Sequence, residues 1–126
     1  APASGLAPAA GTMARYRLME WLNFLTSELH KGFGPLFAPY TPEDYKPVTK
    51  ARLMDKLSWV DQQLEGKSYL MGEGFTVADG YLFTITNWTN FVGMDISGLK
   101  NLGAFMGRVA ARPKVQDALK AEGLLK

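Results

Sequence analysis

Three polar side chains in the segment 20–31 have types and spacings that could do chemistry: Asn23, Ser27 and His30. At about 100° per residue they fall on one stripe of a helix, opposite a stripe of leucines. Amide and hydroxyl groups can hydrogen-bond a peptide-like ligand, and an imidazole can donate to a thiolate. The alternative is that all three face water, and that His30 and Lys31 only complement the negative end of the helix dipole.

A second pattern lies at residues 76–92. Thr76 and Asp79 have the spacing of a capping box, in which the Thr hydroxyl accepts from the amide three residues on and the Asp carboxylate accepts from the Thr amide. No charged residue follows until Asp95, so this stretch predicts a buried central helix with an internal cap. Such boxes can cap any helix, and taken alone the box indicates no function.

Both segments resemble motifs of cytosolic glutathione transferases. The run from Gly72 to Leu82, Gly-Glu-Gly-Phe-Thr-Val-Ala-Asp-Gly-Tyr-Leu, resembles the motif that opens the core helix of their all-helical C-terminal domain. The run from Glu20 to Lys31, Glu-Trp-Leu-Asn-Phe-Leu-Thr-Ser-Glu-Leu-His-Lys, is similar to a helix of the bacterial beta class. The resemblance covers almost the entire chain and implies the C-terminal domain of a bacterial beta-class glutathione transferase.

The resemblance also implies a site. His30 would lie near the sulfur of glutathione, the co-substrate, and act as the catalytic residue, with no metal. Phe33 and Trp88 would line the hydrophobic electrophile pocket, although Trp88 could equally be a core aromatic. Thr76 and Asp79 would be structural. The residues implied to contact glutathione are Asn23, Ser27, Glu28, Leu29, His30 and Lys31.

In this family a thioredoxin-like α/β domain precedes the helical domain and supplies most glutathione contacts, including a catalytic cysteine in the beta class. Neither a strand–helix–strand segment nor a cysteine occurs in the chain. We therefore expect a homodimeric parent enzyme that conjugates glutathione to small hydrophobic electrophiles in detoxification, or acts as a thiol transferase or peroxidase. This chain alone should turn over little. The alternative is a non-catalytic dimerisation or docking module, which would not need the polar stripe.

The composition excludes several classes of site. The 126 residues carry a net charge of +2 with acids and bases interspersed, which gives no nucleic-acid footprint. Zero cysteines and one histidine leave no disulfide, no thiolate metal site and no His-rich metal site. No signal-peptide or membrane-spanning pattern occurs, so a cytoplasmic protein is expected.

The periodicity predicts an all-α bundle of five or six helices. Residues 1–11 are rich in Pro, Gly and small residues and are expected to be a remnant of an interdomain linker, with the helical domain at 12–126. A first helix should run from Thr12 to about Lys31, with Gly32 as its stop signal. The further helices are expected near 47–66, 76–92, 99–112 and 113–122.

Overall fold

The first helical run is longer than its sequence suggests. In the computed structural model, α1 (Met13–Phe24) passes into a π-helical segment, η2 (Leu25–His30), and then into α2 (Lys31–Phe37) without a break. Thr12 caps this run as predicted, since its hydroxyl accepts from the backbone amide of Arg15 at 3.2 Å.

The prediction that Gly32 ends the first helix is wrong. A Cβ atom at Gly32 would lie 2.8 Å from Cδ2 of Leu53 on the facing helix. Real Cβ atoms do not approach so closely, so the glycine permits the contact between two helices. Glycine often marks the end of a helix in a sequence, but Gly32 lies inside a helix and allows Leu53 to pack closely against it.

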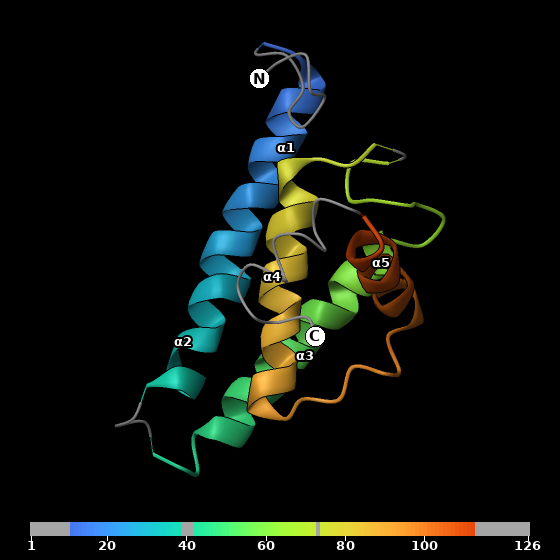
Figure 1. Ribbon diagram of the computed structural model, residues 1–126. Coiled ribbons are helices and arrows are strands. Elements are labelled where there is room, and N and C mark those ends of the chain that lie inside the picture. The colour runs from blue at the N-terminus through green and yellow to red at the C-terminus, as the bar shows by residue number, and fades with distance from the viewer. Residues whose placement is uncertain (1–10, 39–41, 73, 113–126) are drawn as a thin grey trace.

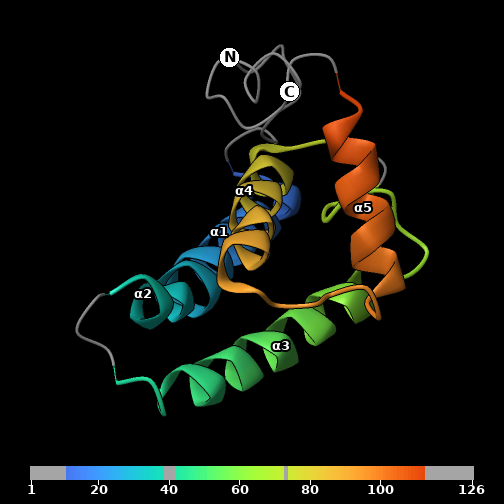
Figure 2. The ribbon, with the colours of Figure 1, turned by 60° about the horizontal axis from the view of Figure 1, so that its bottom comes forward.

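Three more helices complete the bundle: α3 (Lys46–Gln63), α4 (Val77–Val92) and α5 (Lys100–Ala110). Figure 1 shows α4 running beside the α1–η2–α2 rod and in the same direction. From below, α4 lies between that rod and α5, while α3 crosses under them (Figure 2). Among the described residues, no helix is both long and apolar enough to cross a membrane.

The structure describes residues 11–38, 42–72 and 74–112, and over these ranges the fold is helical with no strand. The predicted all-α class is thus confirmed. The described residues form four helical runs rather than five or six, and the helix expected at 113–122 lies outside the described residues. An isolated bridge joins Tyr69 and Gly72 in the loop before α4.

The core is apolar and α4 is its central helix. Seven residues of α4 are buried, more than in any other helix described. One face of α3, with its C-cap residue, is buried along its length, as helical periodicity in the sequence predicts: Leu53, Leu57, Val60 and Leu64. Burial of apolar side chains is the main favourable term in folding. The packed core therefore fixes the relative positions of the helices that carry the candidate site.

The capping box of α4 is present and internal, as predicted. The Asp79 carboxylate accepts from the backbone amide of Thr76 at 2.8 Å, and both residues are buried. The other carboxylate oxygen accepts from the amide of Leu70 at 2.8 Å. Asp79 therefore caps α4 and also ties the preceding loop to it.

Candidate functional site

His30 is placed by the π-helical segment. The backbone amide of Lys31 donates to the carbonyl of Thr26, five residues earlier, where an α-helix would use the residue four earlier. One extra residue in the turn rotates the side chains that follow it. Turns of this kind are rare and occur frequently at functional sites.

The His30 ring packs against α4. Its Nδ1 lies 2.6 Å from the hydroxyl oxygen of Tyr81, a hydrogen-bond distance. The ring meets Tyr81 and Trp88 edge-on, with centroid distances of 5.8 and 5.1 Å. Tyr81 and Trp88 are seven residues apart and so lie on one face of α4, two turns from each other. His30 as a residue is nevertheless exposed.

An aromatic surface continues from Trp88. Phe37 lies 5.8 Å from Trp88 between ring centroids and is half exposed, while Phe33 lies 5.6 Å from Trp88 and is fully buried. Phe33 therefore supports Trp88 from the core side instead of facing open space. The apolar surface available to a ligand comes from Trp88 and Phe37. Sequence reasoning missed Phe37, although its spacing of four from Phe33 in a helix would have placed them together.

Three of the other residues implied to contact glutathione lie on the side of the rod that faces α3. Ser27, Glu28 and Lys31 line a polar pocket of about 260 Å³ together with Arg52 and Lys56 of α3. The single polar stripe expected from helical periodicity is thus divided. His30 meets α4, whereas Ser27 and Lys31 border the pocket against α3.

Within this group the side chains have different roles. Glu28 pairs with Lys56 at 2.7 Å, and the Ser27 hydroxyl donates to the backbone carbonyl of Asn23 at 2.7 Å. Asn23 is exposed. The Leu29 side chain is fully buried in the core, so only its main chain could face a ligand.

Asp79 is the one buried carboxylate among the described residues, and its chemistry is structural. Burial raises the pKa of Asp79. Hydrogen bonds from the amides of Leu70 and Thr76, the Thr76 hydroxyl and the positive charge of Arg112 act in the opposite direction. The cost of desolvation outweighs these contacts.

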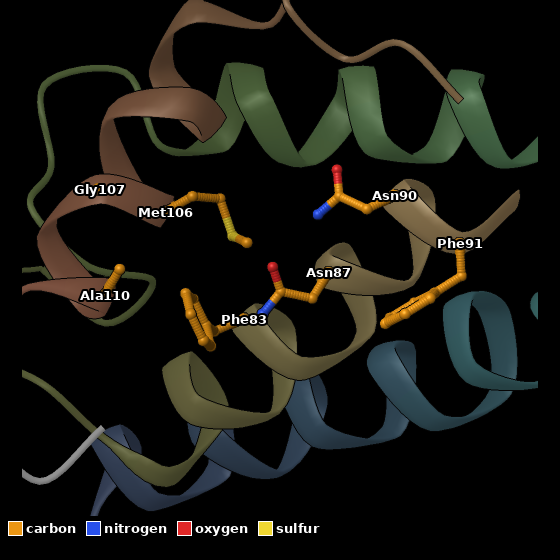
Figure 3. A pocket seen from close by; sticks show the side chains of 7 residues that line it. All are labelled: Phe83, Asn87, Asn90, Phe91, Met106, Gly107 and Ala110. Carbon is orange, nitrogen blue, oxygen red and sulfur yellow. The ribbon is translucent and has the colours of Figure 1, made fainter. Parts of the chain in front are cut away.

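A second hollow lies away from the predicted site. A pocket of about 370 Å³ separates α4 from α5 (Figure 3). Figure 3 shows the amide groups of Asn87 and Asn90 and the side chains of Phe83 and Met106 around this space. None of the residues predicted from sequence lines it. In the described part of the chain, no three His, Asp or Glu side chains gather into a possible metal site.

Comparison with known proteins gives consistent relatives. The family profile described as "Glutathione S-transferase, C-terminal domain" matches residues 24–113. The chain is 50% identical over 119 residues to glutathione S-transferase GstA of Escherichia coli O157:H7, covering 94% of this chain and 59% of that protein. It therefore spans less than two thirds of the length of this relative.

Solved structures agree with the sequence comparison. A bacterial beta-class glutathione S-transferase from Sphingomonas chungbukensis superimposes with a TM-score of 0.94 at 46% identity, covering 98% of this chain and 62% of that one. A sphingomonad glutathione S-transferase complexed with glutathione gives a TM-score of 0.92 at 47% identity, covering 98% and 61% of the two chains.

Proposed function

This chain belongs to the glutathione S-transferase family, in which it is the all-helical C-terminal domain, and on this basis we propose that it contributes to a glutathione-conjugating site. In the proposal, His30 assists the thiol of glutathione as the catalytic residue. Trp88 and Phe37 border the pocket for a hydrophobic electrophile, with Phe33 behind them.

One observation carries this proposal: the exposed imidazole of His30 lies directly against the half-buried ring of Trp88, next to the exposed ring of Phe37. The His30 ring is 5.1 Å from Trp88, and Trp88 is 5.8 Å from Phe37. A thiolate is the reactive form of a thiol and is favoured by nearby hydrogen-bond donors. An apolar electrophile needs apolar walls. On this domain the donor for the thiolate, His30, and the apolar wall for the electrophile, Trp88 with Phe37, lie side by side.

The polar pocket against α3 supports binding of the peptide part of glutathione. Lys31 and Arg52 border it with positive charge, which suits carboxylates. Ser27 and Glu28 border it as well, and Glu28 could pair with an ammonium group. The proposal also keeps the glutathione contacts that the family resemblance implies for Asn23, Ser27 and Leu29.

In this proposal the chain is part of a longer, homodimeric, cytoplasmic transferase, in which a thioredoxin-like domain supplies the remaining glutathione contacts. Two longer relatives, of which this chain covers 59% and 64%, are named glutathione S-transferases. A non-catalytic docking module is not favoured, because these relatives carry the name of an enzyme. The present chain spans 59% of GstA, so on its own it should bind glutathione weakly.

The proposal is tested through the only histidine of the chain. Titration of the 126-residue chain with glutathione should shift the His30 ring resonances in NMR spectra, and Gln62→Ala on the exposed side of α3 should behave like the wild type. In the full-length transferase, His30→Ala should reduce turnover by about 10²-fold or more, as for loss of a general acid–base group. Unchanged turnover and unchanged glutathione affinity in His30→Ala would instead support a docking module.

A further inference from the structure

A short relay of hydroxyl groups connects η2 to α4 at the candidate site. The Thr26 hydroxyl donates to the Tyr81 hydroxyl oxygen at 3.4 Å, and the Tyr81 oxygen lies 2.6 Å from Nδ1 of His30. Thr26 and His30 belong to the same π-helical segment, so both reach one tyrosine of α4.

The contact from Thr26 bears on where the histidine proton lies. A tyrosine hydroxyl carries a single proton. With the Tyr81 oxygen accepting from Thr26, its own proton is free to point at Nδ1 of His30. A neutral imidazole has one N–H and one bare nitrogen. If Nδ1 accepts, the proton of the neutral ring must lie on Nε2.

We propose that Tyr81, oriented by Thr26, is a positioning residue that holds neutral His30 as the Nε2–H tautomer. Trp88 meets the ring edge-on at 5.1 Å, so the ring is held by a hydrogen bond and by two aromatic neighbours on α4. Partners of this kind set tautomer and ring orientation. The orientation of His30 is therefore a product of the contact between η2 and α4.

The consequence for chemistry rests on the proposed function. A thiolate has lone pairs and no proton, so it needs a donor from the imidazole. The Nε2–H tautomer offers that donor on the nitrogen that Tyr81 does not engage. If Tyr81 were absent, the neutral ring could place its proton on Nδ1 and lose the donor for part of the time.

NMR spectra of the sole histidine test this inference without any enzymatic assay. The ¹⁵N shifts of the two ring nitrogens report which one carries the proton, at about pH 8.5, where an ordinary imidazole is neutral. In the wild type we expect protonated Nε2 and an Nδ1 shift typical of a hydrogen-bond acceptor. In Tyr81→Phe the minor Nδ1–H population should rise by about tenfold, the size expected for loss of one hydrogen bond.

Matched variants separate positioning from folding. Tyr16→Phe removes the same hydroxyl from an exposed tyrosine and should leave the histidine spectrum unchanged. Thr26→Ser keeps a hydroxyl at the start of the relay and should resemble the wild type, whereas Thr26→Val should raise the Nδ1–H population by about twofold. Identical ring spectra in wild type and Tyr81→Phe would overturn the inference, as would a wild-type ring protonated on Nδ1.

Adding glutathione to the same samples distinguishes this inference from the proposed function. Shifts of the His30 signals in the wild type, with about fivefold weaker binding in Tyr81→Phe, support both. A second outcome is that the wild-type ring is the Nε2–H tautomer, that this preference is lost in Tyr81→Phe, and that glutathione shifts neither spectrum. This result supports the tautomer assignment and contradicts the glutathione site. Glutathione binding of equal strength in both proteins overturns the positioning role of Tyr81.

Discussion

Replacing Asp79 with alanine should strongly destabilise the domain. The carboxylate accepts three buried hydrogen bonds, from the amides of Leu70 and Thr76 at 2.8 Å each and from the Thr76 hydroxyl at 3.3 Å. In Asp79→Ala both amides lose their partner inside the core. An unsatisfied buried amide costs about 1–3 kcal/mol, and two of them cost about 2–6 kcal/mol.

Part of this loss is offset, because the wild type buries a carboxylate whose pKa is raised by desolvation. We therefore expect the free energy of unfolding to fall by about 2–4 kcal/mol in Asp79→Ala, out of about 5–15 kcal/mol for a typical domain. The loss exceeds that of an exposed helix cap, which is typically about 1 kcal/mol, because Asp79 also holds the loop at Leu70.

Urea unfolding followed by tryptophan fluorescence measures this difference by linear extrapolation. Asp95→Ala is the matched control, since Asp95 is exposed and accepts one backbone hydrogen bond, from Ser97 at 2.9 Å. The control should lose much less stability. A loss below about 0.5 kcal/mol in Asp79→Ala, or one equal to that of the control, would refute the reasoning from buried amides.

Three further predictions concern Asp79, Gly32 and Thr86. Burial raises the pKa of Asp79, so the stability that its protonation contributes is full below the ordinary value of 3.8 and is lost as the pH rises through the raised value. Urea midpoints of the wild type should therefore fall relative to those of Asp79→Asn as the pH is raised above about 4, and a constant or opposite difference would contradict this. Gly32→Ala should destabilise the domain by about 1 kcal/mol, because the new Cβ would press on Leu53. Gly34→Ala should stabilise it by up to about 1 kcal/mol, since no atom of the described residues lies within 4 Å of the new Cβ, and equal melting shifts in the two variants would refute the packing role of Gly32. Thr86→Val should raise the free energy of unfolding by about 1 kcal/mol, because the buried Thr86 hydroxyl has no hydrogen-bond partner among the residues that the structure describes. Destabilisation of this variant in urea would show that the hydroxyl is satisfied.

Local chemistry made much of the fold predictable from sequence. The capping box joins residues three apart, so Thr76 and Asp79 could be read without knowing any tertiary contact. The buried seam of α3 follows from helical periodicity for the same reason. The family could be recognised because two such local segments, at 20–31 and 72–82, lie within one chain.

Gly32 shows where that reasoning stops. Its residue type predicts a helix end, and only the position of Leu53 on α3 reveals a close helix contact. Likewise the family resemblance implied that Phe33 lines a pocket, but its side chain lies fully buried behind Trp88. In both cases the outcome depends on which helix lies opposite, and that is not encoded within a few residues.

The sequence by itself determined the all-helical class, the capped core helix, the family and the position of a histidine on a polar stripe of the first helix. The tertiary structure alone decided that η2 is a π turn, that His30 meets Tyr81 and Trp88, and that Ser27 and Lys31 face α3 instead. The physical reason is the distance along the chain over which each interaction acts. Caps and periodicity act within one or two turns, whereas the environment of His30 is made by a helix that begins more than forty residues later in the chain.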